Sequence, residues 1–217
     1  MQRVYLALFM LLISSETLSS VTIDRTRLIL QKGGSGYLTL KNPSESIENV
    51  SLTVKDENEE SVRNKIIFTP NYLSLKPNES KVVRFMSLGD WESKGELYFL
   101  TMDEVPSKKE GFNISLSSRI KIFVRESDSK IDYDHSLSFS CGKGFISVKN
   151  QTNEYLSVNR IFYTGHFEND DYGLSMIKPN SQIEVPVNDA CKLRNKNISV
   201  EYINGYGGME TYEYKVN

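Results

Sequence analysis

Few residues in this chain could carry out chemistry, and their types limit what that chemistry could be. Two cysteines, Cys141 and Cys191, and two histidines, His135 and His166, occur among 217 residues. Neither histidine has the spacing of a metal-ligand cluster with the cysteines. No Ser/His/Asp or Cys/His arrangement suggests an activated nucleophile. We therefore predict no metal site, no cofactor and no enzymatic activity.

Phosphate and nucleic-acid binding are not predicted either. The glycine cluster Gly33-Gly34-Ser35-Gly36 could approach a phosphate closely. However, no Gly-Lys-Ser/Thr sequence follows it and no helical pattern begins there, so we interpret it as a turn. Lysine and arginine (26) nearly balance aspartate and glutamate (28), for a formal net charge of −2. A chain without excess positive charge gives no reason to expect a nucleic-acid partner.

Residues 1–20 have the pattern of a secretory signal peptide. Arg3 supplies a weakly positive start, and small polar residues follow the apolar run Tyr5–Ile13, which is too short to span a bilayer. No later segment is apolar enough for a membrane helix, so we predict an exported chain without membrane insertion. In an exported protein an even pair of cysteines most simply forms a disulfide, here Cys141–Cys191. The alternative is two buried free thiols.

One stretch has a regular pattern that indicates how the chain could bind another protein. From Phe112 to Arg125 every second residue is apolar or small, which is the period of a strand with one dry face: Phe112, Ile114, Leu116, Ser118, Ile120, Ile122 and Val124. The second half can complete the core of its own domain, whereas Phe112, Ile114 and Leu116 would extend past that core. Since a long apolar strand edge is normally an aggregation hazard, we interpret this half as a surface that pairs with another protein. The alternative is ordinary core packing.

The elements around this strand predict an all-β protein of two tandem immunoglobulin-like β-sandwich domains. Residues 21–126 contain about seven strand patterns with turn signals between them, and the first pattern is Val21–Leu30. The polar stretch 127–134 is predicted to be a linker, and residues 135–217 repeat the all-β pattern. Within the first domain, Asp56–Arg63 is interpreted as a charged, solvated loop.

Several short motifs, in order along the chain, resemble those of the periplasmic pilus-assembly chaperones of the chaperone–usher pathway. Each motif alone is weak, and the resemblance rests on the ordered set, which covers nearly the whole mature chain. The motifs are Ile23-Asp24-Arg25-Thr26-Arg27, Thr69-Pro70, Leu75-Lys76-Pro77-Asn78, Val83-Arg84-Phe85, Tyr98-Phe99, Glu104-Val105-Pro106, Ile120-Lys121-Ile122-Phe123-Val124-Arg125, Val148-Lys149-Asn150-Gln151-Thr152, Lys178-Pro179 and Tyr202-Ile203-Asn204-Gly205-Tyr206-Gly207-Gly208.

The resemblance implies a boomerang of two domains that captures pilus subunits, which are sandwiches lacking their last strand. In that family the chaperone's G strand fills the gap until an outer-membrane usher replaces it with a neighbouring subunit's extension. By this likeness, Arg27 and Lys121 hold the subunit's C-terminal carboxylate, and Phe112, Ile114 and Leu116 fill its core pockets. The implied location is the periplasm, where the free protein could cover its own G strand as a homodimer.

The resemblance also implies an ion pair between the domains at Arg125, but the two acidic positions align with Gly95 and Gly205. Glu96, one residue from the first, is the predicted substitute, and none is evident for the second. A cis peptide bond is implied at Thr69–Pro70.

A secreted adhesin or binding module made of tandem sandwiches is the competing prediction. A pilin itself would need a donor extension at its N-terminus and a missing final strand, whereas this chain has a complete first domain with an overlong G strand. Loss of binding in an Arg27 or Lys121 variant would separate a chaperone from an adhesin.

Overall fold

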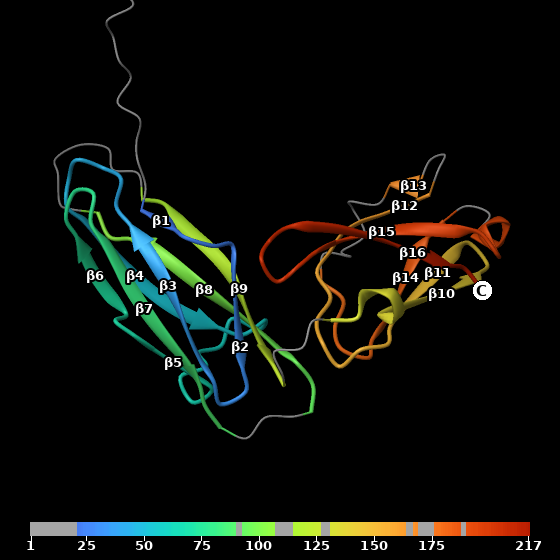
Figure 1. Ribbon diagram of the computed structural model, residues 1–217, viewed down its shortest axis with the longest axis horizontal. Coiled ribbons are helices and arrows are strands. Elements are labelled where there is room, and N and C mark those ends of the chain that lie inside the picture. Colours follow the sequence, from blue (N-terminus) through green and yellow to red (C-terminus); the bar gives the residue numbers. More distant parts are fainter. Residues whose placement is uncertain are drawn as a thin grey trace, which may run out of the picture.

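The computed structural model describes residues 21–89, 93–106, 115–126, 131–163, 167–168, 176–187 and 190–217. The predicted signal peptide, Phe112 and Ile114 lie outside these residues. The described chain forms two β-sheet domains that meet at an angle, which confirms the predicted fold class (Figure 1). Its helical pieces are two short 3₁₀ turns, η1 (Tyr133–His135) and η2 (Ala190–Leu193). No helix in these ranges is long and apolar enough to cross a membrane.

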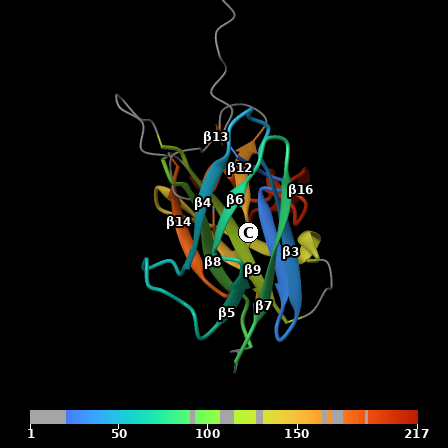
Figure 2. The same ribbon diagram turned by 90° about the vertical axis from the view of Figure 1, so that its left-hand side faces the viewer.

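The first domain is a sandwich of two sheets, with strand orders β1-β3-β7-β5 and β2-β9-β8-β4-β6. In Figure 2 this domain lies in front, and the strands of both sheets run along its length. The peptide bond Thr69–Pro70, between β5 and β6, is cis, as the resemblance implied. The strands are β1 Thr22–Ile23, β2 Arg27–Gln31, β3 Ser35–Lys41, β4 Glu48–Lys55, β5 Ile66–Thr69, β6 Tyr72–Leu75, β7 Ser80–Ser87, β8 Glu96–Glu104 and β9 Ser117–Arg125.

Alternating apolar side chains from the two sheets form the core of this domain. Leu38 of β3 and Phe85 of β7 come from one sheet, and they pack in one buried cluster with Leu100 of β8 and Ile122 of β9 from the other. Each large apolar side chain that is fully buried stabilises the fold by about 1.5–3 kcal/mol. The same alternation leaves the other side of β9 free to carry polar groups outside the core.

The stretch Val21–Leu30, predicted as one strand, is divided between the two sheets. β1 pairs antiparallel with β3 in one sheet, whereas β2 pairs in parallel with β9 in the other. The chain crosses between the sheets at residues 24–26, where three polar residues interrupt the apolar pattern. Because β2 begins only at Arg27, it covers β9 from Lys121 to Arg125 and leaves the earlier part of β9 uncovered.

The strand predicted over Phe112–Arg125 begins, within the described residues, at Ser117. Its ladder with β8 ends at the pair Asp103–Ser117, although the amide of Glu104 still donates to the carbonyl of Leu116 at 3.0 Å. The predicted dry face is confirmed at Ile120, Ile122 and Val124, which are buried, while Leu116 is 44% exposed. β9 therefore completes the core with its second half, and its first described residues lie at the rim.

The second domain is a smaller sandwich with strand orders β10-β11-β14 and β13-β12-β15-β16. Its buried cluster includes Phe139, Val148, Ile161 and Tyr202. The predicted strand over 174–177 is described only at its last two residues, where Ile177 forms an isolated bridge with Leu156. The strands are β10 Leu137–Gly142, β11 Phe145–Asn150, β12 Val158–Tyr163, β13 Phe167–Glu168, β14 Gln182–Pro186, β15 Asn197–Ile203 and β16 Met209–Lys215.

The two domains share one internal device, a fully buried asparagine that we call the asparagine brace. The side-chain amide of Asn42 donates to the carbonyls of Ser46, Leu75 and Lys76 at 2.8, 3.1 and 3.1 Å. In the second domain the amide of Asn150 donates to the carbonyls of Glu154, Ile177 and Lys178 at 2.8, 3.3 and 2.9 Å. Each brace joins the turn that follows its own strand to a Lys-Pro-Asn turn elsewhere in the domain. A buried amide with this many partners is fully satisfied, so it fixes both turns.

Candidate functional site

Arg27 and Lys121 lie side by side on the outer face of the first domain, where that face meets the second domain. They are register partners in the parallel pair of β2 and β9. The neighbouring residues Leu28 and Ile122 point into the core, so Arg27 and Lys121 must leave the opposite side of the sheet. The strand pairing therefore brings together the two cations that the sequence separates by more than ninety positions.

Arg27 is held at the junction of the two domains. Its Nη1 donates to the carbonyl of Ile203, in the second domain, at 2.9 Å, and its guanidinium carbon lies 5.8 Å from the centre of the Phe123 ring. The residue is only 8% exposed, and within the described ranges its Nε has no hydrogen-bond partner. Burial lowers the pKa of Arg27, and the charge of Arg125 adds to that effect while Tyr133 opposes it.

Lys121 is half-buried, and its ammonium group has no hydrogen bond or ion pair with any residue that the structure describes. Burial lowers the pKa of its ammonium group, and the positive charge of Arg27 lowers it further. Removing a cation from water without an opposing charge is unfavourable, and a second cation beside it raises that cost. This pair of positive charges is therefore suited to bind an anion.

The edge of β9 next to this pair is open in the described part of the chain. β8 lines one side of β9 from Ser117 to Val124, whereas β2 lines the other side only from Lys121 onward. Arg119 points to the same face as Lys121, but its charge is satisfied by Glu59, whose Oε1 lies 2.7 Å from Nη2. A strand edge that ends beside two unpaired cations can accept a further strand whose end carries a negative charge.

The prediction that Glu96 pairs with Arg125 is wrong. Glu96 accepts a hydrogen bond from the hydroxyl of Tyr98 and lies 3.8 Å from the ammonium of Lys65, both in the first domain. Arg125 instead pairs with Glu154 of the second domain, with 3.9 Å between Nε and Oε2. Because adjacent strand residues point to opposite faces, the side chain of Glu96 leaves the strand on the side opposite to that of a side chain at position 95.

Glu154 is the residue that the sequence analysis missed. It stands in an ordinary polar turn, and its role depends on the packing of one domain against the other, which no local pattern records. The two glycines at the aligned acidic positions were the available signal. A Cβ at Gly95 would lie 2.2 Å from Oε2 of Glu154, and a Cβ at Gly205 would lie 2.5 Å from Cδ1 of Ile29. Each glycine thus leaves room for a side chain that arrives from the other domain.

The predicted disulfide is absent from the structure, in which Cys141 and Cys191 are free thiols. They are nevertheless neighbours: Cys141 lies near the end of β10, and the Cys191 thiol donates to the carbonyl of Gly142 at 3.6 Å. A hydrogen bond from Cys191 lowers the pKa of the Cys141 thiol, and the same contact raises that of Cys191. Both thiols lie on elements of the second domain, whereas the cation pair belongs to the first.

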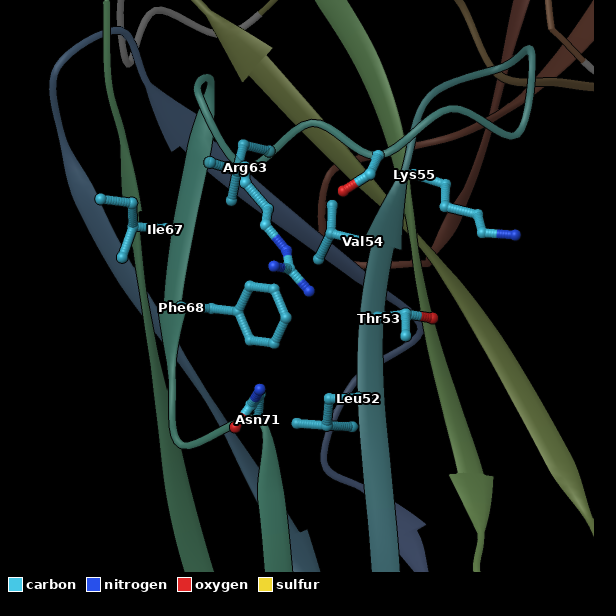
Figure 3. Close-up of a pocket in the computed structure, with 10 residues that line it drawn as sticks. Leu52, Thr53, Val54, Lys55, Arg63, Ile67, Phe68 and Asn71 are labelled. Carbon is cyan, nitrogen blue, oxygen red and sulfur yellow. The ribbon is translucent and has the colours of Figure 1, made fainter.

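A groove of about 400 Å³ lies between β4 and β5 at the side of the first domain. Figure 3 shows Leu52, Val54, Phe68 and Arg63 directed into it, whereas Ile67 points away. None of the predicted site residues that the structure describes lines this groove. Among the described residues, no group of three or more His, Cys, Asp and Glu side chains could hold a metal ion.

Comparison with known proteins gives the family. Residues 20–128 match the family described as "Pili and flagellar-assembly chaperone, PapD N-terminal domain", and residues 132–214 match "Pili assembly chaperone PapD, C-terminal domain". The chain is 22% identical over 223 residues to the Escherichia coli chaperone protein FaeE, covering 95% of this chain and 83% of FaeE. It is 26% identical over 171 residues to the probable fimbrial chaperone LpfB of Escherichia coli O157:H7, covering 73% of this chain and 74% of LpfB.

Solved structures agree in fold. The complex of the Salmonella enterica SafA pilin with the SafB chaperone matches with a TM-score of 0.77 at 21% identity, over 93% of this chain and 98% of that one. The Escherichia coli chaperone DraB matches with a TM-score of 0.76 at 20% identity, over 91% and 98%. Since the two family matches together span nearly all of residues 20–214, the chain belongs to the pilus-assembly chaperones with PapD-type N- and C-terminal domains.

Proposed function

We propose that this chaperone works in the periplasm, where it binds a pilus subunit by lending it the edge of β9 and by holding the subunit's C-terminal carboxylate between Arg27 and Lys121, before an outer-membrane usher receives the subunit. One observation carries this proposal. Two neighbouring cations, buried or half-buried and without an acidic partner among the described residues, lie where an open strand edge ends.

The strand edge supplies most of the affinity in this proposal. Burying three large apolar side chains, here Phe112, Ile114 and Leu116, gives roughly 5–9 kcal/mol before ordering costs. Of these, Leu116 is within the described residues and is 44% exposed, so it is available to a partner. Phe112 and Ile114 lie outside the described residues, and their role remains a prediction.

The two cations set the register of the added strand. A carboxylate held by charged donors gains a few kcal/mol at most after desolvation, which is less than the apolar contribution. However, a slip of one residue would turn every apolar side chain of the added strand to the wrong face. A fixed end at Lys121 excludes that slip because the chain terminus can occupy only one position.

The SafA–SafB structure supports the proposal by analogy, because it is a complex of a pilin with a chaperone. The adhesin alternative has no such support, since the family to which the chain belongs is one of chaperones. A self-capped homodimer of the free protein is a further expectation from the open edge.

A co-purification experiment tests the proposal. Wild type, Lys121→Ala, Arg27→Ala and the control Lys81→Ala are each isolated from the periplasm of the native host, and the partners are identified by mass spectrometry. Lys81 is a suitable control because it is a partly exposed lysine that already contacts Glu79, at 3.7 Å. We expect a sandwich-type subunit in roughly equal amount with wild type and control, and its loss in the other two variants. A partner that binds all four proteins equally would refute the carboxylate site, and the absence of any partner would favour the adhesin.

A further inference from the structure

We propose that the turn Asn153–Tyr155 of the second domain is a clamp that sets the angle between the domains, with Glu154 and Glu57 as positioning residues for the cation pair, Arg27 and Lys121. The clamp itself is inferred from contacts between the domains. Its effect on subunit binding rests on the proposed function.

The three consecutive residues of this turn contact three different parts of the first domain. The carbonyl of Asn153 accepts a hydrogen bond from the amide of Gly95 at 2.7 Å, just before β8 begins. Glu154 pairs with Arg125 at the end of β9. The hydroxyl of Tyr155 donates to Oε2 of Glu57 at 2.8 Å, in the loop after β4. Contacts at three separated points resist rotation about any one of them.

The pair of Glu154 and Arg125 is the charged part of the clamp. Their side chains are 21% and 12% exposed, so salt and water screen the pair less than a surface ion pair. Burial raises the pKa of Glu154, and the neighbouring Arg125 opposes that shift. Arg125 lies 5.7 Å from the centre of the Phe123 ring, and Arg27 lies 5.8 Å from the same ring. The carboxylate of Glu154 therefore balances one of the cations that gather on this face.

Gly95 makes the pair possible. A Cβ there would come within 2.2 Å of Oε2 and 3.1 Å of Cδ of Glu154, so any larger residue would push the carboxylate away from Arg125. The nearest backbone atom to that Cβ is the carbonyl oxygen of Asn153 at 3.4 Å, an ordinary contact. The substitution Gly95→Ala therefore displaces one carboxylate and leaves the rest of the turn in place.

Glu57 forms the second fixed point. Besides the hydroxyl of Tyr155, its Oε2 accepts from the ammonium of Lys178 at 3.1 Å. Burial raises the pKa of Tyr155, and the hydrogen bond to Glu57 raises it further. The loop 56–63, interpreted from sequence as merely solvated, thus reaches the second domain through one of its acids.

The asparagine brace makes the clamp rigid within the second domain. Asn150 donates to the carbonyls of both Glu154 and Lys178, at 2.8 and 2.9 Å. The hydroxyl of Thr152 accepts from the amide of Glu154 at 3.2 Å. Glu154, which pairs with Arg125, and Lys178, which pairs with Glu57, are consequently both held by the buried side chain of Asn150.

The clamp affects the cation pair because it fixes the position of the second domain next to Arg27. Arg125 and Lys121 lie on the same face of β9, and Arg27 is joined to the second domain through the carbonyl of Ile203. A change in the angle between the domains moves Ile203 relative to Arg27 and breaks the hydrogen bond between them. If loss of the clamp leaves about a tenth of the molecules at the wild-type angle, apparent affinity for the subunit falls about tenfold.

Small-angle X-ray scattering on the full mature chain measures the angle without any ligand. The variants are Glu154→Gln, Gly95→Ala, the double variant, and Glu57→Gln. Glu59→Gln is the matched control, because Glu59 lies two residues from Glu57 but pairs with Arg119 and Lys55 inside the first domain. We expect a larger maximum dimension for the first four proteins and the wild-type curve for the control.

The double variant separates a positioning role from general loss of stability. If Gly95→Ala acts by displacing Glu154, adding Glu154→Gln to it changes nothing further, whereas independent packing effects would add. The second readout is the amount of subunit that co-purifies from the periplasm, expected to fall about tenfold in the clamp variants. Scattering curves identical to wild type, or additive effects in the double variant, overturn the clamp. If wild type itself captures no subunit, the proposed function fails, and the scattering data still decide the clamp.

Discussion

Replacing Lys121 by methionine should make the free protein more stable and the complex weaker. Methionine keeps an unbranched side chain of similar length on β9 but removes the charge. In the free protein that charge is half-buried, lies beside Arg27, and has no acidic partner among the residues described. A lysine that only packed on the surface would give no such gain in stability.

The size of the gain follows from the spacing of the strands. Neighbouring strands are about 4.8 Å apart, so two cations at roughly 5 Å in an effective dielectric constant of roughly 40 repel by about 1.7 kcal/mol. Salt and the exposed part of Lys121 reduce this to about 1 kcal/mol. For a domain of roughly 100 residues, such a change raises Tm by about 4 °C.

The pH dependence has a definite sign. The pKa of Lys121 is lowered in the folded protein by burial and then by Arg27, so the unfolded chain holds this proton more tightly. The destabilisation by Lys121 is therefore complete below the lowered pKa and disappears as the pH rises through it. The difference in Tm between Lys121→Met and wild type should accordingly shrink in alkaline buffer.

Calorimetry of the mature proteins and titration with the subunit that co-purifies with wild type would measure both effects. A lost charged hydrogen bond of about 1.5–3 kcal/mol corresponds to a subunit affinity roughly 10-fold to 100-fold weaker. Lys81→Met serves as the control and should leave affinity unchanged. A lower Tm for Lys121→Met, or an unchanged affinity, would refute the reasoning that an uncompensated cation awaits a carboxylate.

Three further predictions concern other parts of the chain. Asn150→Ala should lower the free energy of unfolding in urea by about 3 kcal/mol, because three carbonyls lose a buried donor, and Asn42→Ala should cost a similar amount. Ellman titration of the native protein should find two thiols, because Cys141 and Cys191 are free in the structure. Leu116→Asp should abolish subunit capture while leaving Tm unchanged, because the side chain is 44% exposed in the free protein.

Each of these has an outcome that contradicts it. A urea midpoint for either asparagine variant equal to that of wild type would show that the braces are dispensable. Native protein without titratable thiols would show that Cys141 and Cys191 form a disulfide, contrary to the structure. A marked fall in Tm for Leu116→Asp would show that Leu116 belongs to the core of its own domain.

The fold class could be predicted because the strand signals are local. Alternation at Ile120, Ile122 and Val124, and turns such as Lys76-Pro77-Asn78, each lie within a few residues of chain. The division of Val21–Leu30 between two sheets could not be predicted in the same way. Both of its halves are apolar, and which sheet each half joins depends on β3 and β9, which lie elsewhere in the sequence.

The residues of the candidate site likewise differ in how far they could be predicted from local sequence. Arg27 and Lys121 were found through motifs, and the parallel register then placed them together. Glu96 was chosen as the partner of Arg125 because it is one residue from the aligned acidic position, Gly95, but it is Gly95 that faces Glu154. The true partner, Glu154, arrives from another domain. Contacts between domains are set by shape and relative orientation, and these have no periodicity in the sequence.

The two asparagine braces make the same kind of hydrogen bonds, but only the second one holds residues that contact the other domain. All the carbonyls held by Asn42 belong to residues of the first domain, whereas Asn150 holds Glu154 and Lys178, which both contact the first domain. A substitution at Asn42 is absorbed locally, while one at Asn150 is also transmitted across the junction. Natural selection should therefore tolerate sequence drift around the first brace more readily than around the second, although the two cost a similar free energy of folding.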